Sequence, residues 1–194
     1  MVFRLLLLIA MVGLAGCAGN EASEQPHQPK ANAAWRKSLG DATFITLAAG
    51  ETREFKITTD LQTFGFPEGI SYFVGLALPR SDRPRTLTLR TLPVNPLRPR
   101  ATHVFIPRIA IVASDGKVSR YAEPDFRPGT PGLLARSSSW QGSVELAAGE
   151  LRIAVYTATL LPRTLRLPQV NEPGGYWYVP SAPTGVIEIS LNDG

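Results

Sequence analysis

The fold is decided by the stretch Arg85-Thr86-Leu87-Thr88-Leu89-Arg90-Thr91-Leu92, in which apolar and polar residues alternate with a period of two. Successive side chains of a β-strand point to opposite faces, so Leu87 and Leu89 share one face of the expected strand. We therefore predict a strand with that face buried in a core.

Other stretches show related patterns. Residues 71–78 are almost continuously apolar, which suits a central strand of a packed sheet. Residues 104–112 are strongly apolar but contain Pro107, which indicates an edge strand or a bulge. Residues 114–117 (Ser-Asp-Gly-Lys) then give a hairpin signal. Six more strands are expected at residues 43–47, 53–57, 118–121, 142–146, 151–157 and 185–191.

About nine strands at this spacing are typical of antiparallel sandwiches. The chain has 17 prolines and 17 glycines to separate them, and no segment shows a sustained helical period. We predict an all-β fold, an antiparallel β-sandwich of jelly-roll-like type, over residues 35–194.

One five-residue sequence occurs twice. Leu47-Ala48-Ala49-Gly50-Glu51 recurs as residues 146–150, and an alternating strand follows each copy. The favoured interpretation is one kind of hairpin used twice, with glycine in the turn and the flanking strands paired across it. The alternative is a duplicated ligand-binding loop.

The first residues are typical of a secretory signal. Arg4 precedes an apolar run over residues 5–12 that is too short to span a bilayer. Leu14-Ala15-Gly16-Cys17 then has the form of a bacterial lipoprotein cleavage box, and Cys17 is the only cysteine. We predict removal of residues 1–16, a diacylglyceryl thioether on Cys17 and further acylation, for example by palmitate. Two or more acyl chains anchor a protein stably in a membrane.

The residues after Cys17 predict where the anchored protein resides. Ala18 stands where an aspartate would favour retention in the inner membrane, so we expect an outer-membrane lipoprotein that faces the periplasm. Residues 17–34 are the lipidated cysteine and a polar, proline-containing tether with little to bury. His27 lies in this tether.

Composition and motifs argue against several classes of function. The formal net charge of +4, which falls to +3 without Arg4, is too mild to indicate nucleic-acid binding in an exported protein. His27 and His103 are the only histidines, so no histidine cluster for a metal is expected. There is no Gly-x-Ser-x-Gly motif and no phosphate-binding glycine loop. We expect a non-enzymatic protein without a cofactor.

Two groups of residues are candidates for binding. Aromatic rings stack on sugars, and Tyr176, Trp177 and Tyr178 follow a glycine-rich loop, with Trp140 a further candidate. The alternative is that this loop folds over one end of the sandwich and buries alternate rings. The second group is basic and suits an anionic envelope surface or an acidic partner, although a solvated loop explains it as well. It comprises Arg80, Arg83, Arg85, Arg90, Arg98, Arg100 and Arg108.

The strand sequences resemble the maltose operon periplasmic protein family (MalM-like). The resemblance is carried by residues 66–73, 87–91, 104–112, 142–146, 153–157 and 182–185. It implies an exported accessory protein for maltose or maltodextrin uptake, without catalytic residues. The lipid box departs from the freely soluble form of that family. The alternative function is an interaction lipoprotein that docks onto another component of the cell envelope.

Overall fold

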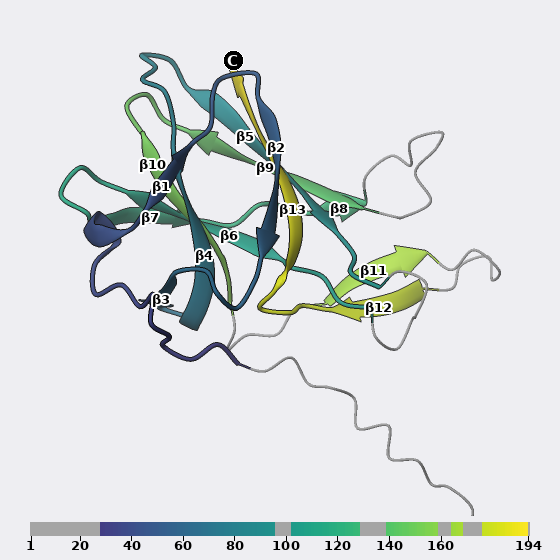
Figure 1. Cartoon of the computed structure of the whole chain (residues 1–194). Coiled ribbons are helices and arrows are strands. Elements are labelled where there is room, and N and C mark those ends of the chain that lie inside the picture. Colours follow the sequence, from purple (N-terminus) through teal and green to yellow (C-terminus); the bar gives the residue numbers. More distant parts are fainter. Residues whose placement is uncertain (1–27, 96–101, 129–138, 159–163, 169–175, 194) are drawn as a thin grey trace, which may run out of the picture.

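The computed structural model describes residues 28–95, 102–128, 139–158, 164–168 and 176–193. Within them the chain forms thirteen strands and one short 3₁₀ helix, η1 (Leu39–Asp41). Two sheets pack face to face, and a two-stranded ribbon lies at one side of them (Figure 1). No helix among these residues has the length and apolar character needed to cross a bilayer.

The six-stranded sheet has β4 and β10 at its centre. Its order is β1 (Phe44–Thr46), β4 (Gly69–Ala77), β10 (Arg152–Thr157), β6 (Pro107–Val112) and β7 (Val118–Ala122), with β3 (Thr63–Phe66) also paired to β4. β1 pairs with the second half of β4 in parallel, whereas β3 pairs with its first half in antiparallel. All other pairs in this sheet are antiparallel.

The five-stranded sheet is antiparallel throughout. Its order is β2 (Thr52–Ile57), β13 (Gly185–Asp193), β5 (Arg85–Leu92), β9 (Trp140–Leu146) and β8 (Arg127–Pro128). The ribbon consists of β11 (Thr164–Pro168) and β12 (Tyr176–Pro180). The ribbon is attached to the sandwich by backbone hydrogen bonds that Val104 makes with Pro180 and Ala182.

The main core lies between the two sheets. Along β5 the residues alternate between buried and half-buried, and Leu87 and Leu89 face inward as the sequence pattern predicts. They pack in one cluster with inward-facing residues of the opposite sheet, such as Val74 on β4 and Val155 on β10. Burial of apolar area of this kind is the main stabilising contribution in a fold without a disulfide.

The six-stranded sheet is also buried on its outer face. Phe73 and Tyr156 point outward from β4 and β10 and pack under a cover that includes Leu39 of η1 and Phe66 of β3. The Phe66 and Tyr156 rings stack with centroids 3.7 Å apart. A strand buried on both faces needs apolar residues at every position, which explains the continuous apolar run of β4.

The sequence predictions of fold class and strands are confirmed. Each of the nine expected strands corresponds to a strand of the structure, and β6 and β7 form a hairpin across the 114–117 turn. The edge-strand alternative for residues 104–112 was wrong, because β6 lies between β10 and β7. This strand does contain a bulge, but not at Pro107, which is its first residue. The bulge lies between Ile111 and Val112 instead. Four short strands were not foreseen: β3, β8, β11 and β12.

The interpretation of the repeated sequence as a hairpin was wrong. Residues 47–51 connect β1 to β2 and residues 146–150 connect β9 to β10, and in each case the two strands belong to different sheets. We call these connections the first arch and the second arch. In both, a glycine with positive φ, Gly50 or Gly149, makes the turn, and the glutamate carboxylate accepts a hydrogen bond from the backbone N–H of Ala48 or Ala147.

Candidate functional site

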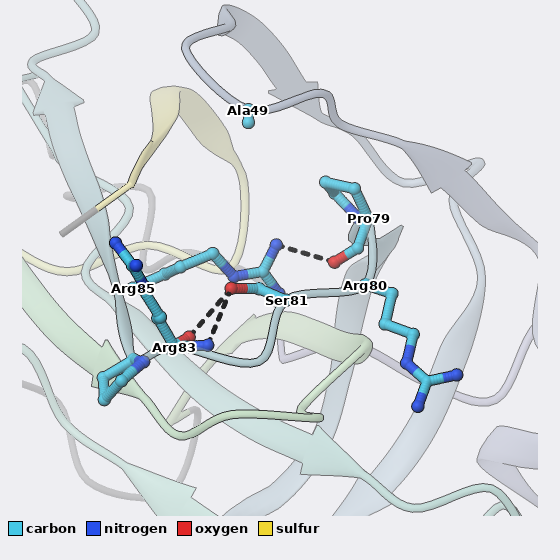
Figure 2. A pocket seen from close by; sticks show the side chains of 7 residues that line it. Ala49, Pro79, Arg80, Ser81, Arg83 and Arg85 are labelled. Carbon is cyan, nitrogen blue, oxygen red and sulfur yellow. Dashed lines mark hydrogen bonds between the residues drawn. The ribbon is translucent and has the colours of Figure 1, made fainter.

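A pocket of about 310 Å³ lies at the end of the sandwich where the two arches meet the β4–β5 connection. We call it the arginine pocket, because three of its seven lining residues are arginines (Figure 2). The arches and this connection are held together by backbone hydrogen bonds, including one of 3.1 Å from Gly149 to the carbonyl of Ser81. Its lining comprises Ala49, Pro79, Arg80, Ser81, Arg83, Pro84 and Arg85.

Arg85 is the innermost of these arginines. It is the first residue of β5 and lies on the same face as Leu87, so its side chain points inward and the residue is only 2% exposed. Its guanidinium donates hydrogen bonds from Nη1 to the Pro79 carbonyl (2.7 Å) and from Nη2 to the Glu150 carbonyl (3.2 Å). Its Nε is buried and has no hydrogen-bond partner in the part of the chain that the structure describes. Both contacts are to neutral carbonyl groups, so neither supplies a counter-charge.

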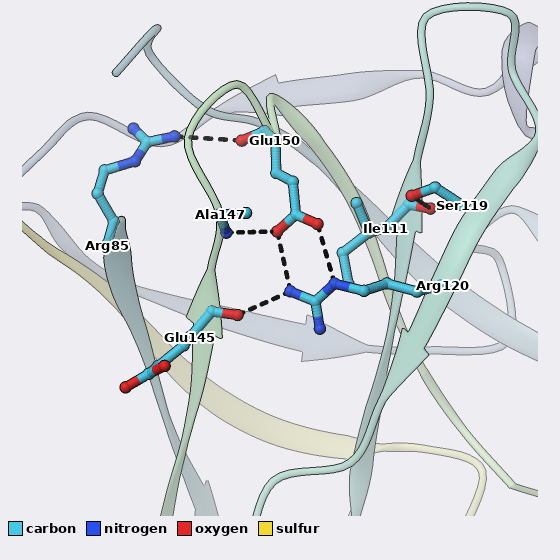
Figure 3. Close-up of polar contacts among 7 residues, drawn as sticks. All are labelled: Arg85, Ile111, Ser119, Arg120, Glu145, Ala147 and Glu150. Carbon is cyan, nitrogen blue, oxygen red and sulfur yellow. Dashed lines mark hydrogen bonds and ion pairs between the residues drawn. The ribbon is translucent and has the colours of Figure 1, made fainter. Parts of the chain in front are cut away.

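Glu150 contacts Arg85 through its backbone carbonyl, but its carboxylate pairs with another arginine. Figure 3 shows it turned away from Arg85 and toward Arg120 of β7. Arg120 Nε and Nη2 each donate to one oxygen of this carboxylate at 2.9 Å, and Ala147 N–H donates to it at 2.8 Å. The bonds from Arg120 are the main cause that lowers the pKa of Glu150. Among the side chains that the structure describes, therefore, no carboxylate forms an ion pair with Arg85. The side chain of Asp193, the β13 residue opposite Arg85, lies outside that part of the structure.

The outer part of the arginine pocket is open to solvent. Arg80 and Arg83 are exposed, and Figure 2 shows the Arg80 side chain extending away from the Arg85 guanidinium. The Ser81 hydroxyl donates to the Arg83 carbonyl at 2.9 Å and accepts from the Arg83 N–H at 3.1 Å. Those contacts shape the turn and leave Ser81 without a basic partner that would activate it.

The other residues of the predicted basic group do not join this pocket. Arg90 pairs with Glu188 at 2.9 Å and donates to the Ser139 hydroxyl. Arg108 pairs with Glu68 and with Glu123, the latter at 2.7 Å, on the outer face of the six-stranded sheet. Arg98 and Arg100 lie outside the described residues. The group is therefore not one continuous surface among the described residues.

The aromatic candidates are on a strand rather than in the predicted loop. Tyr176, Trp177 and Tyr178 belong to β12, which pairs with β11. The side chains of the first two lie outside the described part of the structure. Tyr178 is 63% exposed, and the Arg166 guanidinium lies over its ring at 5.7 Å from the centroid.

Trp140 is a core residue. It is 2% exposed, packs with Val104, Ile106 and Val179, and donates from Nε1 to the Arg166 carbonyl at 3.2 Å. Its ring offers no free face to a ligand, so the structure corrects its assignment as a candidate stacking residue. The reason is that β9 directs Trp140 toward the interface between the sandwich and the ribbon.

The remaining sequence candidates are the single cysteine and the two histidines. Cys17 and His27 lie outside the described residues, and His103 forms an isolated β-bridge with Val94. In the described ranges, no group of three or more His, Cys, Asp or Glu side chains is arranged to hold a metal ion. Comparisons with family models, with curated proteins and with solved structures found no match for this chain.

Proposed function

We propose that this chain is an exported, lipid-anchored accessory protein of the cell envelope that binds a ligand or partner and does not convert it. The anchor part of the proposal is supported by the Leu14–Cys17 box and by the polar segment that follows it. The binding part is supported by the chemistry of the arginine pocket.

The observation that carries the binding function is the composition of the arginine pocket. Its lining offers guanidinium groups, one hydroxyl and two prolines, and it contains no carboxylate or imidazole. General acid–base and nucleophilic catalysis need a titratable group beside the reacting atom. Arginine stays protonated and acts by attracting and orienting anionic groups. Such a lining suits recognition.

The test of the anchor is metabolic labelling with palmitate followed by fractionation of the membranes. We expect label on the wild-type chain and none on Cys17→Ser, which should remain unprocessed or mislocalised. Ala18→Asp should keep the label and move from the outer to the inner membrane fraction. Label on Cys17→Ser, or none on the wild type, would contradict the proposal.

A role in maltose or maltodextrin uptake is a second candidate, favoured by the exposed Tyr178 ring, by the two further aromatic residues in the sequence of β12 and by the MalM-like resemblance. Calorimetric titration with maltodextrins should give dissociation constants from high micromolar to millimolar, about −4 to −6 kcal/mol. Tyr178→Ala and Trp177→Ala should weaken this binding. Flat titrations over several glucans would favour the alternative role, docking onto another envelope component.

A further inference from the structure

We propose that the arginine pocket binds a phosphate-type oxyanion, for which Arg85 supplies the buried anchoring charge. This inference rests on the proposed binding function and names the class of ligand. It concerns a different part of the molecule from the β12 aromatics.

The first argument is that no described side chain balances the charge of Arg85. A guanidinium has five N–H donors, and the two hydrogen bonds that Arg85 makes to described residues leave three of them, including the buried Nε–H, without a partner among those residues. A buried cation is costly unless an opposite charge and further hydrogen bonds satisfy it. The Glu150 carboxylate is committed to Arg120. An anion bound in the arginine pocket would supply both the counter-charge and the hydrogen-bond acceptors that Arg85 needs.

The second argument is the charge of the surrounding segment. Arg80, Arg83 and Arg85 all line the pocket, whereas Asp82 of the same segment is exposed and does not. Such an excess of positive charge favours a dianion over a singly charged carboxylate. The planar fork of a guanidinium also matches the spacing of phosphate oxygens. A volume of about 310 Å³ has room for a phosphate group with a small organic substituent.

The test is a calorimetric titration of the full chain, in a non-ionic detergent, with inorganic phosphate. We expect saturable binding at one site that weakens as salt is added. Arg83→Ala removes an exposed pocket charge without disturbing the core and should weaken binding about tenfold or more. Arg127→Ala is the matched control, because it also removes one exposed arginine but lies on β8, away from the arches.

Two further measurements address the chemistry of the anion. A phosphate monoester such as glucose 6-phosphate loses its second proton near pH 6, so its affinity should rise between about pH 5 and pH 7.5, whereas that of sulfate should stay constant. Acetate at the same concentration should bind more weakly than either. Equal affinity for acetate and phosphate would overturn the preference for a dianion.

Arg85 itself is tested by ligand-induced stabilisation. Phosphate should raise the melting temperature of the wild type, since a ligand that binds only the native state stabilises it. Arg85→Met should abolish this rise. If Arg85→Met does not fold, Arg85→Lys, which keeps the charge but loses the planar fork, should show a reduced rise.

The source of the phosphate group is distinguished by two probes. Binding of inorganic phosphate and glucose 6-phosphate indicates a soluble ligand. Binding only to detergent micelles doped with phosphatidic acid, whose headgroup is a phosphate monoester, and not with phosphatidylcholine, indicates a lipid headgroup. Flat titrations with all of these probes, or equal binding by Arg83→Ala, would overturn the oxyanion site. Palmitate labelling and maltodextrin titration are independent of that result, so they still decide the proposed function.

Discussion

Gly116 and Gly149 differ in how much space the structure leaves for a side chain at each position. Both have positive φ, +82° and +80°, which strains any residue with a Cβ. A Cβ on Gly116 would lie 2.6 Å from the Cα of Gly40, because the β6–β7 turn packs against η1, whereas a Cβ on Gly149 would meet nothing within 4 Å. Gly149→Ala should therefore cost only the backbone strain, about 1–2 kcal/mol.

Gly116→Ala should add an overpacking cost of about 1–3 kcal/mol to the same strain. Urea denaturation of the two variants measures the difference directly. Equal destabilisation would show that the contact between the β6–β7 turn and Gly40 is looser than the structure indicates.

Tyr156 makes stability sensitive to alkali. Its burial, together with the negative charge of Glu68, which accepts a hydrogen bond from its hydroxyl at 3.0 Å, raises the pKa of Tyr156 well above the ordinary value of 10.0. A raised pKa means that the native state keeps its proton after the unfolded state has lost it. Stability should therefore fall as the pH rises above about 10. Tyr156→Phe should be less stable at neutral pH by about 1 kcal/mol, but its stability should decline less between pH 9 and pH 11. Parallel alkaline curves for the two proteins would contradict this.

The environment of single residues was only partly predictable. The inward direction of Leu87 follows from a period of two, and the same period places Arg85 on the inner face of β5. That signal is present in the sequence, but a charged residue next to proline is usually solvated, and the pattern of charges alone suggested a loop. Trp140 shows the opposite case, because its burial depends on a ribbon that is remote in sequence.

At the scale of elements, the two arches have the same sequence, but their glutamates make different side-chain interactions. Glu150 caps the second arch and also forms a bidentate pair with Arg120, and its side chain is 16% exposed. Glu51 caps the first arch and pairs with Arg53 in a more exposed contact, and the main cause that lowers its pKa is the hydrogen bond from the Ala48 N–H. A glutamine at position 51 keeps an oxygen that can accept that bond. Glu150→Gln should cost about 1–2 kcal/mol of stability, and Glu51→Gln clearly less.

The two variants should also differ in acid. The pKa of Glu150 is lowered from an ordinary value of 4.5, so its contribution to stability is present above that pH and is lost as the pH falls below it. The difference in stability between the wild type and Glu150→Gln should therefore become smaller as the pH falls from 5 to 3. Thermal melts across that range are the measurement. A difference in stability that stays constant over this range would contradict a stabilising role for the ionised Glu150 carboxylate.

The arches also show why a connection between two sheets was predicted as a hairpin. A glycine with positive φ between two alternating strands fits a hairpin and an arch equally well, since both need the same local reversal of the chain. The choice depends on which partners the strands find. β1 pairs with β4 and β2 pairs with β13, the latter more than a hundred residues further along the chain.

At the scale of the whole molecule, the fold class was predictable because the strands of each sheet have a characteristic pattern of apolar residues in the sequence. The five-stranded sheet has one buried face and gives alternation, as in β5 and β9. The central strands of the six-stranded sheet are buried on both faces and give continuous apolar runs, as in β4. The three arginines of the arginine pocket were among the basic candidates of the sequence, but the pocket itself was not predicted, because it forms only where two arches and the β4–β5 connection converge.

The last prediction tests the sandwich as a single cooperative unit. Leu89 is fully buried in the core that both sheets share, and β5 pairs on either side with β13 and β9. Leu89→Asp would place an unpaired carboxylate there, at a cost comparable with the roughly 5–15 kcal/mol that holds a native domain together. We expect loss of the β-sheet signal in far-ultraviolet circular dichroism. Thr88→Asp is the control, since Thr88 is half-buried on the opposite face, where the Asn192 side chain donates a hydrogen bond to it and could equally donate to a carboxylate. It should remain folded. A folded Leu89→Asp protein would refute the inward orientation of β5, and an unfolded Thr88→Asp protein would show that both faces of this strand are closed.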